Sequence, residues 1–352
     1  MNKEIWMKPK FCSNIGGEAL IEGVMMRGND RMAMSVRKSS GEIYTETKTY
    51  IAITKRNKLL GLPFIRGAVS MLESMITGVK VLLDSAELVD FTEDEKESKF
   101  DLWMQKKLGA NYVTYLLYSS VVIALAFGIG LFMLLPNLIA DFFSNFLSFD
   151  KTTGGGAIIA NIIEGIIRIC LFILYVFLVS KNSEIKRVFQ YHGAEHKTIY
   201  ALENEEELTV ENVKKHTTLH PRCGTTFMFI VILISIIVFA FAGWHSPIVN
   251  MLLRLALLPV IAGISYEVLK LAAKTDNKLV RVISMPGLML QKITTKEPDD
   301  AMIEVAIASM KAVMVKEPES VVEAASAEAV AAEDKAAEHE AIAKEDDVTS
   351  DS

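Results

Sequence analysis

The chain has 352 residues, of which 51% are hydrophobic, and it carries a formal net charge of −6. Its mean hydropathy is +0.30, and a soluble protein of this length rarely has a positive value. This apolar content excludes a chain that is disordered throughout. An acidic chain is also not expected to bind nucleic acid through its overall charge.

The acidity is confined to the C-terminal end of the chain. Residues 317–352 contain twelve acidic and two basic side chains, a net charge of −10, so the rest of the chain carries +4. This end is rich in Ala and Glu and has no sustained apolar face. It is therefore predicted to be an acidic disordered tail.

Residues 1–110 are predicted to form a cytoplasmic N-terminal region. A Gly-rich segment at 14–28 is followed by two β-prone runs on either side of Ser39, Ser40 and Gly41, a pattern typical of a hairpin. Residues 59–88 have apolar side chains at helical spacing. This stretch is either a helix lying on the membrane surface or an amphipathic helix packed on the hairpin. No signal peptide is expected, because the first residues lack an apolar stretch.

Four long apolar runs predict four transmembrane helices, two within 111–180 and two within 224–272. Residues 108–140 contain no charged side chain, and the second run covers 157–180. The charge-free run 224–253 is interrupted at 243–247 by Gly, Trp and Pro, which predicts a turn between two helices. The predicted fold class is a predominantly α-helical integral membrane protein with a small α+β cytoplasmic portion.

The positive residues predict the orientation of these helices. Residues 181–223 contain seven Lys and Arg side chains, whereas the loops 137–156 and 243–247 together contain one. Because positive residues favour the cytoplasmic side, both termini and 181–223 are expected in the cytoplasm. Residues 273–316 are predicted to form a cytoplasmic loop and a final helix that begins near Pro298. No disulfide is expected in that reducing compartment.

Three charged residues fall inside the predicted spans besides Glu267, which lies near the cytoplasmic end of the fourth. Glu164 and Arg168 have the i, i+4 spacing of an ion pair, which either faces the other helices or lines the polar path of a transporter. Arg254 is close enough to the outer boundary to reach it by snorkelling.

Residues 181–223 hold the most chemically suggestive pattern. If the second span continues as a helix, His192 and His196 are one turn apart on one face, the spacing with which a helix offers two imidazoles to a metal ion. Glu195 completes an H-x-x-E-H pattern, typical of inverted zinc peptidases in which the Glu is a general base. His220 and Cys223 follow in HPRC and could extend the ligand set. Alternatively, these histidines are interfacial side chains, and Gly193 weakens the helix.

Other candidates come from outside this segment. Glu267, near the cytoplasmic end of the fourth span, is an additional candidate for a metal ligand. A carboxylate at this depth must bind a metal ion, pair with a basic side chain or reach the membrane interface by snorkelling. His216 is the weakest member of the set and fits a solvated turn. Glu18 and Glu22 have the spacing of one helix face, and Glu22 is either catalytic or paired with Arg27.

Seven motifs, in the same order, resemble those of the bacterial YqhQ-like family of multi-pass membrane proteins, a domain of unknown function sometimes described as a metal-dependent enzyme. The motifs are IGGEALIEGVMMRG, LPFIRG, YHGAEHKTI, LTVENV, HPRCGT, AGISYE and PGLMLQKITTKEPDDAMIEVAI. The family's HGAEH and HPRCG motifs correspond to His192, Glu195, His196, His220 and Cys223. Gln is frequent in the family at the position of Glu18, which leaves Glu22 the better candidate.

These patterns lead to one leading hypothesis and two alternatives. The first is a membrane-embedded metal-dependent enzyme, most simply a hydrolase, in the bacterial inner membrane. Its metal ligands would come from His192, His196, His220, Cys223 and Glu267, and its catalytic carboxylates would be Glu195 and Glu22. Zinc fits this ligand mixture best, and iron or manganese also fits. The alternatives are a non-enzymatic membrane scaffold, with a structural metal or none, and a transporter. The expected partners are the bilayer and other membrane proteins; the oligomeric state stays open.

Overall fold

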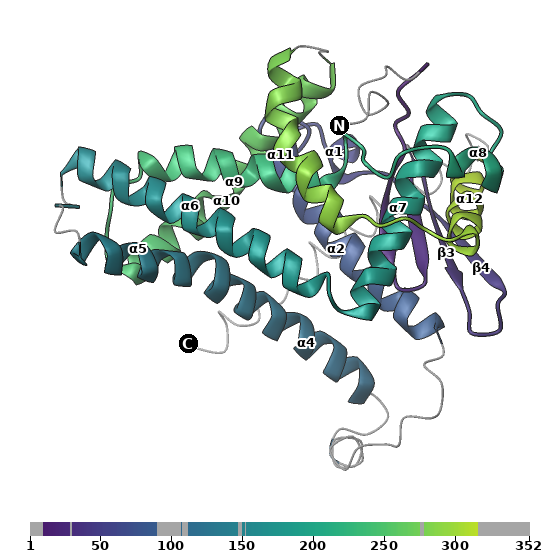
Figure 1. Cartoon of the computed structure of the whole chain (residues 1–352), viewed down its shortest axis with the longest axis horizontal. Helices are drawn as coiled ribbons and strands as arrows, with labels where there is room; N and C mark the ends of the chain where they lie inside the picture. The colour runs from purple at the N-terminus through teal and green to yellow at the C-terminus, as the bar shows by residue number, and fades with distance from the viewer. Residues whose placement is uncertain are drawn as a thin grey trace, which may run out of the picture.

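The computed structural model describes residues 10–28, 30–89, 107, 112–146, 150–151, 153–274 and 278–315. A bundle of long helices forms one end of the molecule, and a small α/β domain forms the other (Figure 1). The predicted acidic tail lies outside the described residues, as does most of the segment that leads into the first apolar run.

The α/β domain is built on a four-stranded antiparallel sheet whose strands follow one another in chain order. The strands are β1 (Gly16–Leu20), β2 (Gly23–Arg27), β3 (Arg31–Arg37) and β4 (Ile43–Thr49). The hairpin expected around Gly41 is β3–β4, and Gly41 has the positive φ of 87° that favours glycine. Residues 16–27 form a second hairpin that turns at Glu22. Glu18 and Glu22 are therefore not on one helix face.

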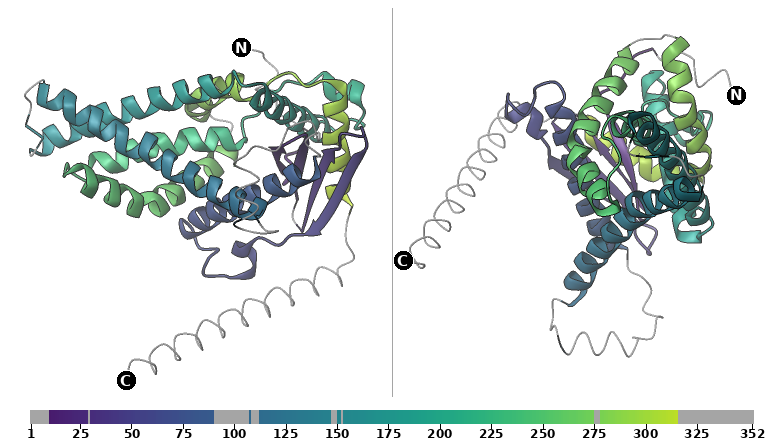
Figure 2. Two further views of the ribbon diagram at one scale, coloured as in Figure 1. Left: turned by 90° about the horizontal axis from the view of Figure 1, so that it is seen from below. Right: turned by 90° about the vertical axis from the view of Figure 1, so that its left-hand side faces the viewer.

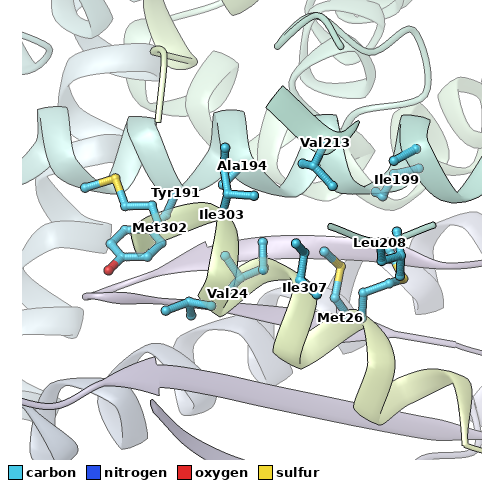
Figure 3. Packing of buried hydrophobic residues seen from close by; sticks show 14 of the residues in the cluster. Val24, Met26, Tyr191, Ala194, Ile199, Leu208, Val213, Met302, Ile303 and Ile307 are labelled. Carbon is cyan, nitrogen blue, oxygen red and sulfur yellow. The ribbon is translucent and has the colours of Figure 1, made fainter. Parts of the chain in front are cut away.

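Helices cover both faces of this sheet. The helices of the α/β domain are α1 (Ile53–Arg56), α2 (Ile65–Leu88), α7 (Ser183–Glu203), α8 (Val210–Lys214) and α12 (Asp300–Met314). Val24 and Met26 point towards α7 and α12 and join the main apolar core (Figure 3). Met25 and Met34 point the other way, towards Val81 of α2. Side chains alternate between the two faces of a strand, and helices cover both faces of this sheet. β2 is therefore buried on both sides, and its sequence does not alternate between polar and apolar residues.

The helical bundle has three helices that are long and apolar enough to cross a membrane. These are Ser119–Phe146, Gly154–Val179 and Pro247–Leu271. A further apolar helix, α9 (Gly224–Ala240), has 17 residues and is shorter than such a span. The protein is thus a mostly helical membrane protein with a small sheet, and its structure supports three of the four predicted spans. Figure 2 shows these helices side by side in two further views.

Several helix boundaries differ from those predicted. The first span runs without a break through α4 (Tyr112–Ile129), the π-helical η3 (Gly130–Leu134) and α5 (Leu135–Phe146), so residues 137–146 are helical instead of forming a loop. The second span, α6 (Gly154–Val179), does not continue into the His segment. Asn182 caps α7 by accepting hydrogen bonds from the backbone N–H groups of Glu184 and Ile185, which starts a new helix.

Of the two helices after the last span, one was predicted and one was not. The last span belongs to α10 (Pro247–Lys274), and α11 (Lys278–Thr294) follows it as a helix with Pro286 inside, although these residues were expected to form a loop. The final helix, α12, begins where predicted, and the Asp299 side chain accepts a hydrogen bond from the Met302 N–H as its N-cap. The end of α11 reaches α7, which places the Thr294 carbonyl beside His192.

Glu164, Arg168 and Arg254 form one buried cluster inside the bundle. Glu164 pairs with Arg168 on its own helix and with Arg254 of α10. Arg254 is 2% exposed, so it does not snorkel to the outer boundary. Its predicted snorkelling is wrong because the Glu164 carboxylate and Asn161 give its guanidinium partners inside the bundle. The expectation that Glu164 and Arg168 pair and face other helices is confirmed.

Candidate metal centre

Three of the predicted metal ligands converge where α7, the first turn of α9 and the end of α11 meet. The ligand atoms of His192, His196 and Cys223 all lie within 4.8 Å of one another. His192 Nε2 is 3.2 Å from Cys223 Sγ, and the two imidazole centroids are 4.4 Å apart. The i, i+4 spacing on α7 places the two rings on one face, and the HPRC turn brings the thiol to them.

Backbone carbonyls orient both imidazoles. His192 Nδ1 is 2.9 Å from the Thr294 carbonyl oxygen, and His196 Nδ1 is bonded to the Thr218 carbonyl oxygen. A carbonyl only accepts a hydrogen bond, so Nδ1 carries a proton in each ring and Nε2 is the atom left for a further partner. Among the described residues, His196 Nε2 is buried without a hydrogen-bond partner. A buried nitrogen of this kind is costly unless a further group binds it, and these residues therefore fit a metal ion.

Cys223 occupies a position that favours a thiolate. It is the N-cap residue of α9, and its sulfur accepts a hydrogen bond from the Thr225 N–H at 3.4 Å. Burial raises the pKa of the Cys223 thiol, but His196 and His192 outweigh this effect and hold the pKa well below its usual range. Burial likewise lowers the pKa of His192, yet the adjacent Cys223 and Glu195 raise it to about 9. The thiolate is the form of cysteine that binds metals.

Gly193, in the middle of HGAEH, allows the backbone of another segment to approach α7. A Cβ atom at this position would lie 2.1 Å from the Lys296 carbonyl oxygen. The Lys296 N–H donates a hydrogen bond to the Phe189 carbonyl oxygen at 2.8 Å, which holds the segment there. Since Thr294 lies two residues before Lys296, this close approach brings its carbonyl to His192. Glycine weakens a helix, and here its missing side chain allows the contact that orients the His192 imidazole.

Gln291 of α11 fixes the turn that carries Cys223. Its side chain is fully buried and accepts a hydrogen bond from the His220 N–H, while its amide donates to the His220 carbonyl oxygen and to Thr226 Oγ1. These bonds satisfy the backbone of HPRC inside the protein. The position of the thiol thus depends on a helix that was expected to be a loop.

His220 lies next to the three converging ligands but not among them. Its ring centroid is 5.5 Å from that of His196, and its Nε2 is 4.0 Å from Glu203 Oε2. Its Nδ1 accepts a hydrogen bond from the Arg222 N–H at 3.3 Å. Burial and the neighbouring His196 hold the pKa of His220 well below its usual value, so the ring is neutral. His220 therefore packs beside the site in contact with Glu203.

Two carboxylates adjoin the three ligands, and two glycines make room for them. Glu195 Oε2 lies 4.0 Å from His192 Nε2, and a Cβ atom on Gly17 would lie 2.7 Å from Glu195 Cγ. Glu18 keeps solvent access on β1, and a Cβ atom on Gly78 would lie 2.5 Å from its Oε1. Burial raises the pKa of both carboxyls, and Glu195 raises that of Glu18 further. Raised carboxyl pKa values in such a site are typical of groups that exchange protons.

The structure places the other two predicted site residues in ion pairs. Glu22 makes two hydrogen bonds of 2.5 Å to Arg187 and accepts one from the Tyr191 hydroxyl. Arg187, rather than the expected Arg27, is its partner, because Glu22 lies in the turn between two strands. Glu267 makes a bidentate pair with Arg66 at 2.7 and 2.5 Å. The group of converging ligand atoms contains neither residue. His216 pairs with Glu206.

Sequence reasoning ranked Glu18 below Glu22 and missed the residues that orient the ligands. The pair of glycines before Glu18 was a usable signal, because adjacent glycines indicate a close approach of other groups. Thr218, Thr294 and Gln291 act through backbone atoms or a buried amide, and no spacing rule could have identified them.

The class defined by this architecture is a membrane protein that carries a His/Cys cluster on a small α/β domain. A profile of the family described as "Protein of unknown function (DUF1385)" matches residues 62–316. The uncharacterized protein YqhQ of Bacillus subtilis (strain 168) is 34% identical over 304 residues, which cover 86% of this chain and 92% of that protein. The chain therefore belongs to the YqhQ-like family. No solved structure matches it.

Proposed function

We propose that the protein is a metal-dependent enzyme of the bacterial inner membrane, most simply a hydrolase, with its site on the cytoplasmic side. The observation that carries the proposal is the convergence of His192, His196 and Cys223. In both imidazoles Nδ1 is bonded to a backbone carbonyl, which leaves Nε2 as the atom that can bind a metal ion. Zinc suits two imidazoles and one thiolate best.

Three protein ligands support an enzyme over a scaffold. Structural zinc sites close with four protein ligands, whereas catalytic sites keep a position open. Among the described residues, only His192, His196 and Cys223 form a group whose ligand atoms all lie within 4.8 Å of one another, and His220 faces Glu203 instead. A divalent metal, when bound, supplies Lewis acidity for the hydrolysis of a polarised substrate bond.

Glu195 is the proposed general base of this site. Its carboxylate is buried, lies 4.0 Å from His192 Nε2 and has a raised pKa, which makes it a stronger proton acceptor than an ordinary carboxylate. Glu18 is a second carboxylate with solvent access and takes the catalytic role first assigned to Glu22, whose oxygens bind Arg187. Proton exchange between Glu195, Glu18 and solvent is the expected use of this arrangement.

Metal content tests the proposal directly. The full chain, purified from its membrane, is expected to contain about one divalent metal ion, and the H192A/H196A and C223S variants are expected to contain almost none. The His216→Ala variant is the matched control, because His216 pairs with Glu206 outside the cluster. Equal metal content in the wild type and in H192A/H196A would reject the metal site.

The number of protein ligands separates an enzyme from a scaffold. With Co²⁺ in place of the native metal, azide should shift the visible absorption bands if one position is open to an external ligand. Unchanged bands would favour the structural metal of a non-enzymatic scaffold. Hydrolysis of chromogenic esters, phosphoesters and amides by the wild type, but not by Glu195→Gln with intact metal content, would then establish the reaction class.

A further inference from the structure

Helix α2 has three distinct faces. Small or short side chains on one face are buried against α10 and the sheet: Gly67, Gly78, Val81 and Ser85. Charged side chains occupy a second face: Arg66, Glu73, Lys80 and Asp84. The third face exposes large apolar side chains, of which Ile76 is 67% exposed. A protein surface in water rarely carries such a continuous apolar stripe without a partner.

The apolar stripe begins before the helix and covers its first three turns. Its members are Leu59, Leu62, Phe64, Ile65, Leu72, Met75 and Ile76, each of them exposed. Phe64 has a φ of 68°, a strained value for a bulky residue. Its backbone is held in this conformation against α10, since a Cβ atom on Gly263 would lie 2.4 Å from the Phe64 carbonyl oxygen.

The contact with α10 places the start of α2 at the level of a membrane span. A Cβ atom on Gly67 would lie 2.9 Å from Gly263 Cα, so the two helix backbones touch. Gly263 lies within the candidate span Pro247–Leu271. It is eight residues from the end of that span, which corresponds to about 12 Å along a helix. The stripe therefore continues the apolar surface of α10.

Charged groups beside the stripe suit the headgroup region of a membrane. Arg66 forms its bidentate pair with Glu267 next to the stripe, and the segment before it carries Lys55 and Lys58. Basic side chains around an apolar helical face are typical of helices that lie in a membrane interface, where lipid headgroups are anionic.

We propose that the first three turns of α2 and the turn before them lie in the lipid leaflet that adjoins the α/β domain. The occupant of the exposed stripe is then lipid, continuous with the lipid around α10. The same helix contacts the candidate metal centre, because Gly78 lies against the Glu18 carboxylate. The solvent-accessible side of the centre thus opens beside the membrane surface. The lipid contact does not depend on the metal or on catalysis.

Spin labels on single cysteines test this placement. The full chain with its native cysteines changed to serine is reconstituted into vesicles of neutral and anionic phospholipid. A nitroxide replaces Ile76 on the stripe in one variant and Lys80, an exposed residue on the charged face, in the matched control. Collisions with oxygen, which dissolves in lipid, and with a water-soluble nickel complex are compared for each label.

The label at position 76 is expected to collide several-fold more often with oxygen than with the nickel complex, and the label at position 80 should show the reverse. Equal access of both positions to the nickel complex would place the stripe in water and overturn the proposal. Low access of position 76 to both reagents would show that a second copy or another protein covers the stripe, which also overturns it. If the cysteine-free chain does not fold, I76W and K80W with brominated lipids give the same comparison by tryptophan quenching.

Discussion

Two buried clusters of ionisable side chains, both among the described residues, differ in how their polar atoms are satisfied. In the helical bundle, the Glu164 carboxylate accepts hydrogen bonds from Arg168, Arg254 and Asn137. At the junction of α7 and α9, His196 Nε2 has no partner among the described residues, although the imidazole is 1% exposed. The first cluster pairs opposite charges within itself, whereas the second leaves a buried imidazole nitrogen open and thus resembles a binding site.

The difference follows from the kinds of groups in each cluster. A carboxylate between two guanidinium groups is electrostatically neutralised, and the Arg254 guanidinium also lies 5.3 Å from the Phe239 ring centroid. Nη1 of Arg254 has no hydrogen-bond partner among the described residues, and this aromatic contact partly compensates for it. In the second cluster, the raised pKa of His192 lets its imidazolium pair with the Cys223 thiolate, but His196 Nε2 stays without a partner among the described residues. A divalent cation that displaced the His192 Nε2 proton could bind both imidazoles and the thiolate, which is the physical basis of the proposed metal centre.

The largest effect should come from breaking the cluster in the bundle. Glu164→Gln leaves two buried guanidinium groups without a counter-charge and should lower the free energy of unfolding by about 3–5 kcal/mol, as measured by denaturant titration in detergent. The double variant E164Q/R254Q removes one charge of each sign and should recover part of the loss. Metal content of the folded protein should stay unchanged. A loss below about 1 kcal/mol would mean that the ion pairs do not neutralise the cluster.

The next effect concerns the orientation of His192. Gly193→Ala places a Cβ atom where the Lys296 carbonyl lies, which should displace the Thr294 carbonyl from His192 and weaken metal binding about 10- to 100-fold. Competition with a chromogenic chelator measures this affinity. Gly224→Ala, beside Cys223, is the control, since nothing lies within 4 Å of its added Cβ. Equal affinities of the two variants would contradict the orienting role of this segment.

A smaller change is expected at the Glu195 carboxylate. Gly17→Ala introduces a Cβ atom 2.7 Å from Glu195 Cγ, and such overpacking typically costs about 1–3 kcal/mol. Gly16→Ala, one residue earlier, has open space around its Cβ and should leave stability almost unchanged. Thermal unfolding of the two variants in the same detergent gives the comparison. If Gly16→Ala were the more destabilising change, the placement of Glu195 against β1 would be wrong.

The smallest effect should follow the loss of Glu267. Because its carboxylate binds Arg66 and the pair is partly exposed, Glu267→Gln should leave metal content unchanged and reduce stability by about 1 kcal/mol or less. Elemental analysis of purified Glu267→Gln, run in parallel with the H192A/H196A variant, tests this expectation. Loss of metal from Glu267→Gln would return this residue to the ligand set.

The sequence by itself determined the membrane character, the β3–β4 hairpin and three members of the His/Cys cluster, His192, His196 and Cys223. Apolar runs need only composition and length, and a hairpin needs only a turn residue between two β-prone runs. The i, i+4 spacing of His192 and His196 is preserved on any helix, so it did not matter that α7 is separate from α6. The local origin of these features explains why they could be predicted.

Only the tertiary structure decided which distant residues complete each cluster. Glu164 and Arg254 are far apart in the sequence, as are His192 and Thr294, and their contacts depend on how whole helices pack. Glu22 and Glu18 could not be ranked from their spacing. Glu22 lies in a two-residue turn and pairs with Arg187, whereas Glu18 lies on β1 near Glu195. Hydrogen bonds to backbone carbonyls carry no residue signature, so the orientation of the imidazoles was visible only in the fold.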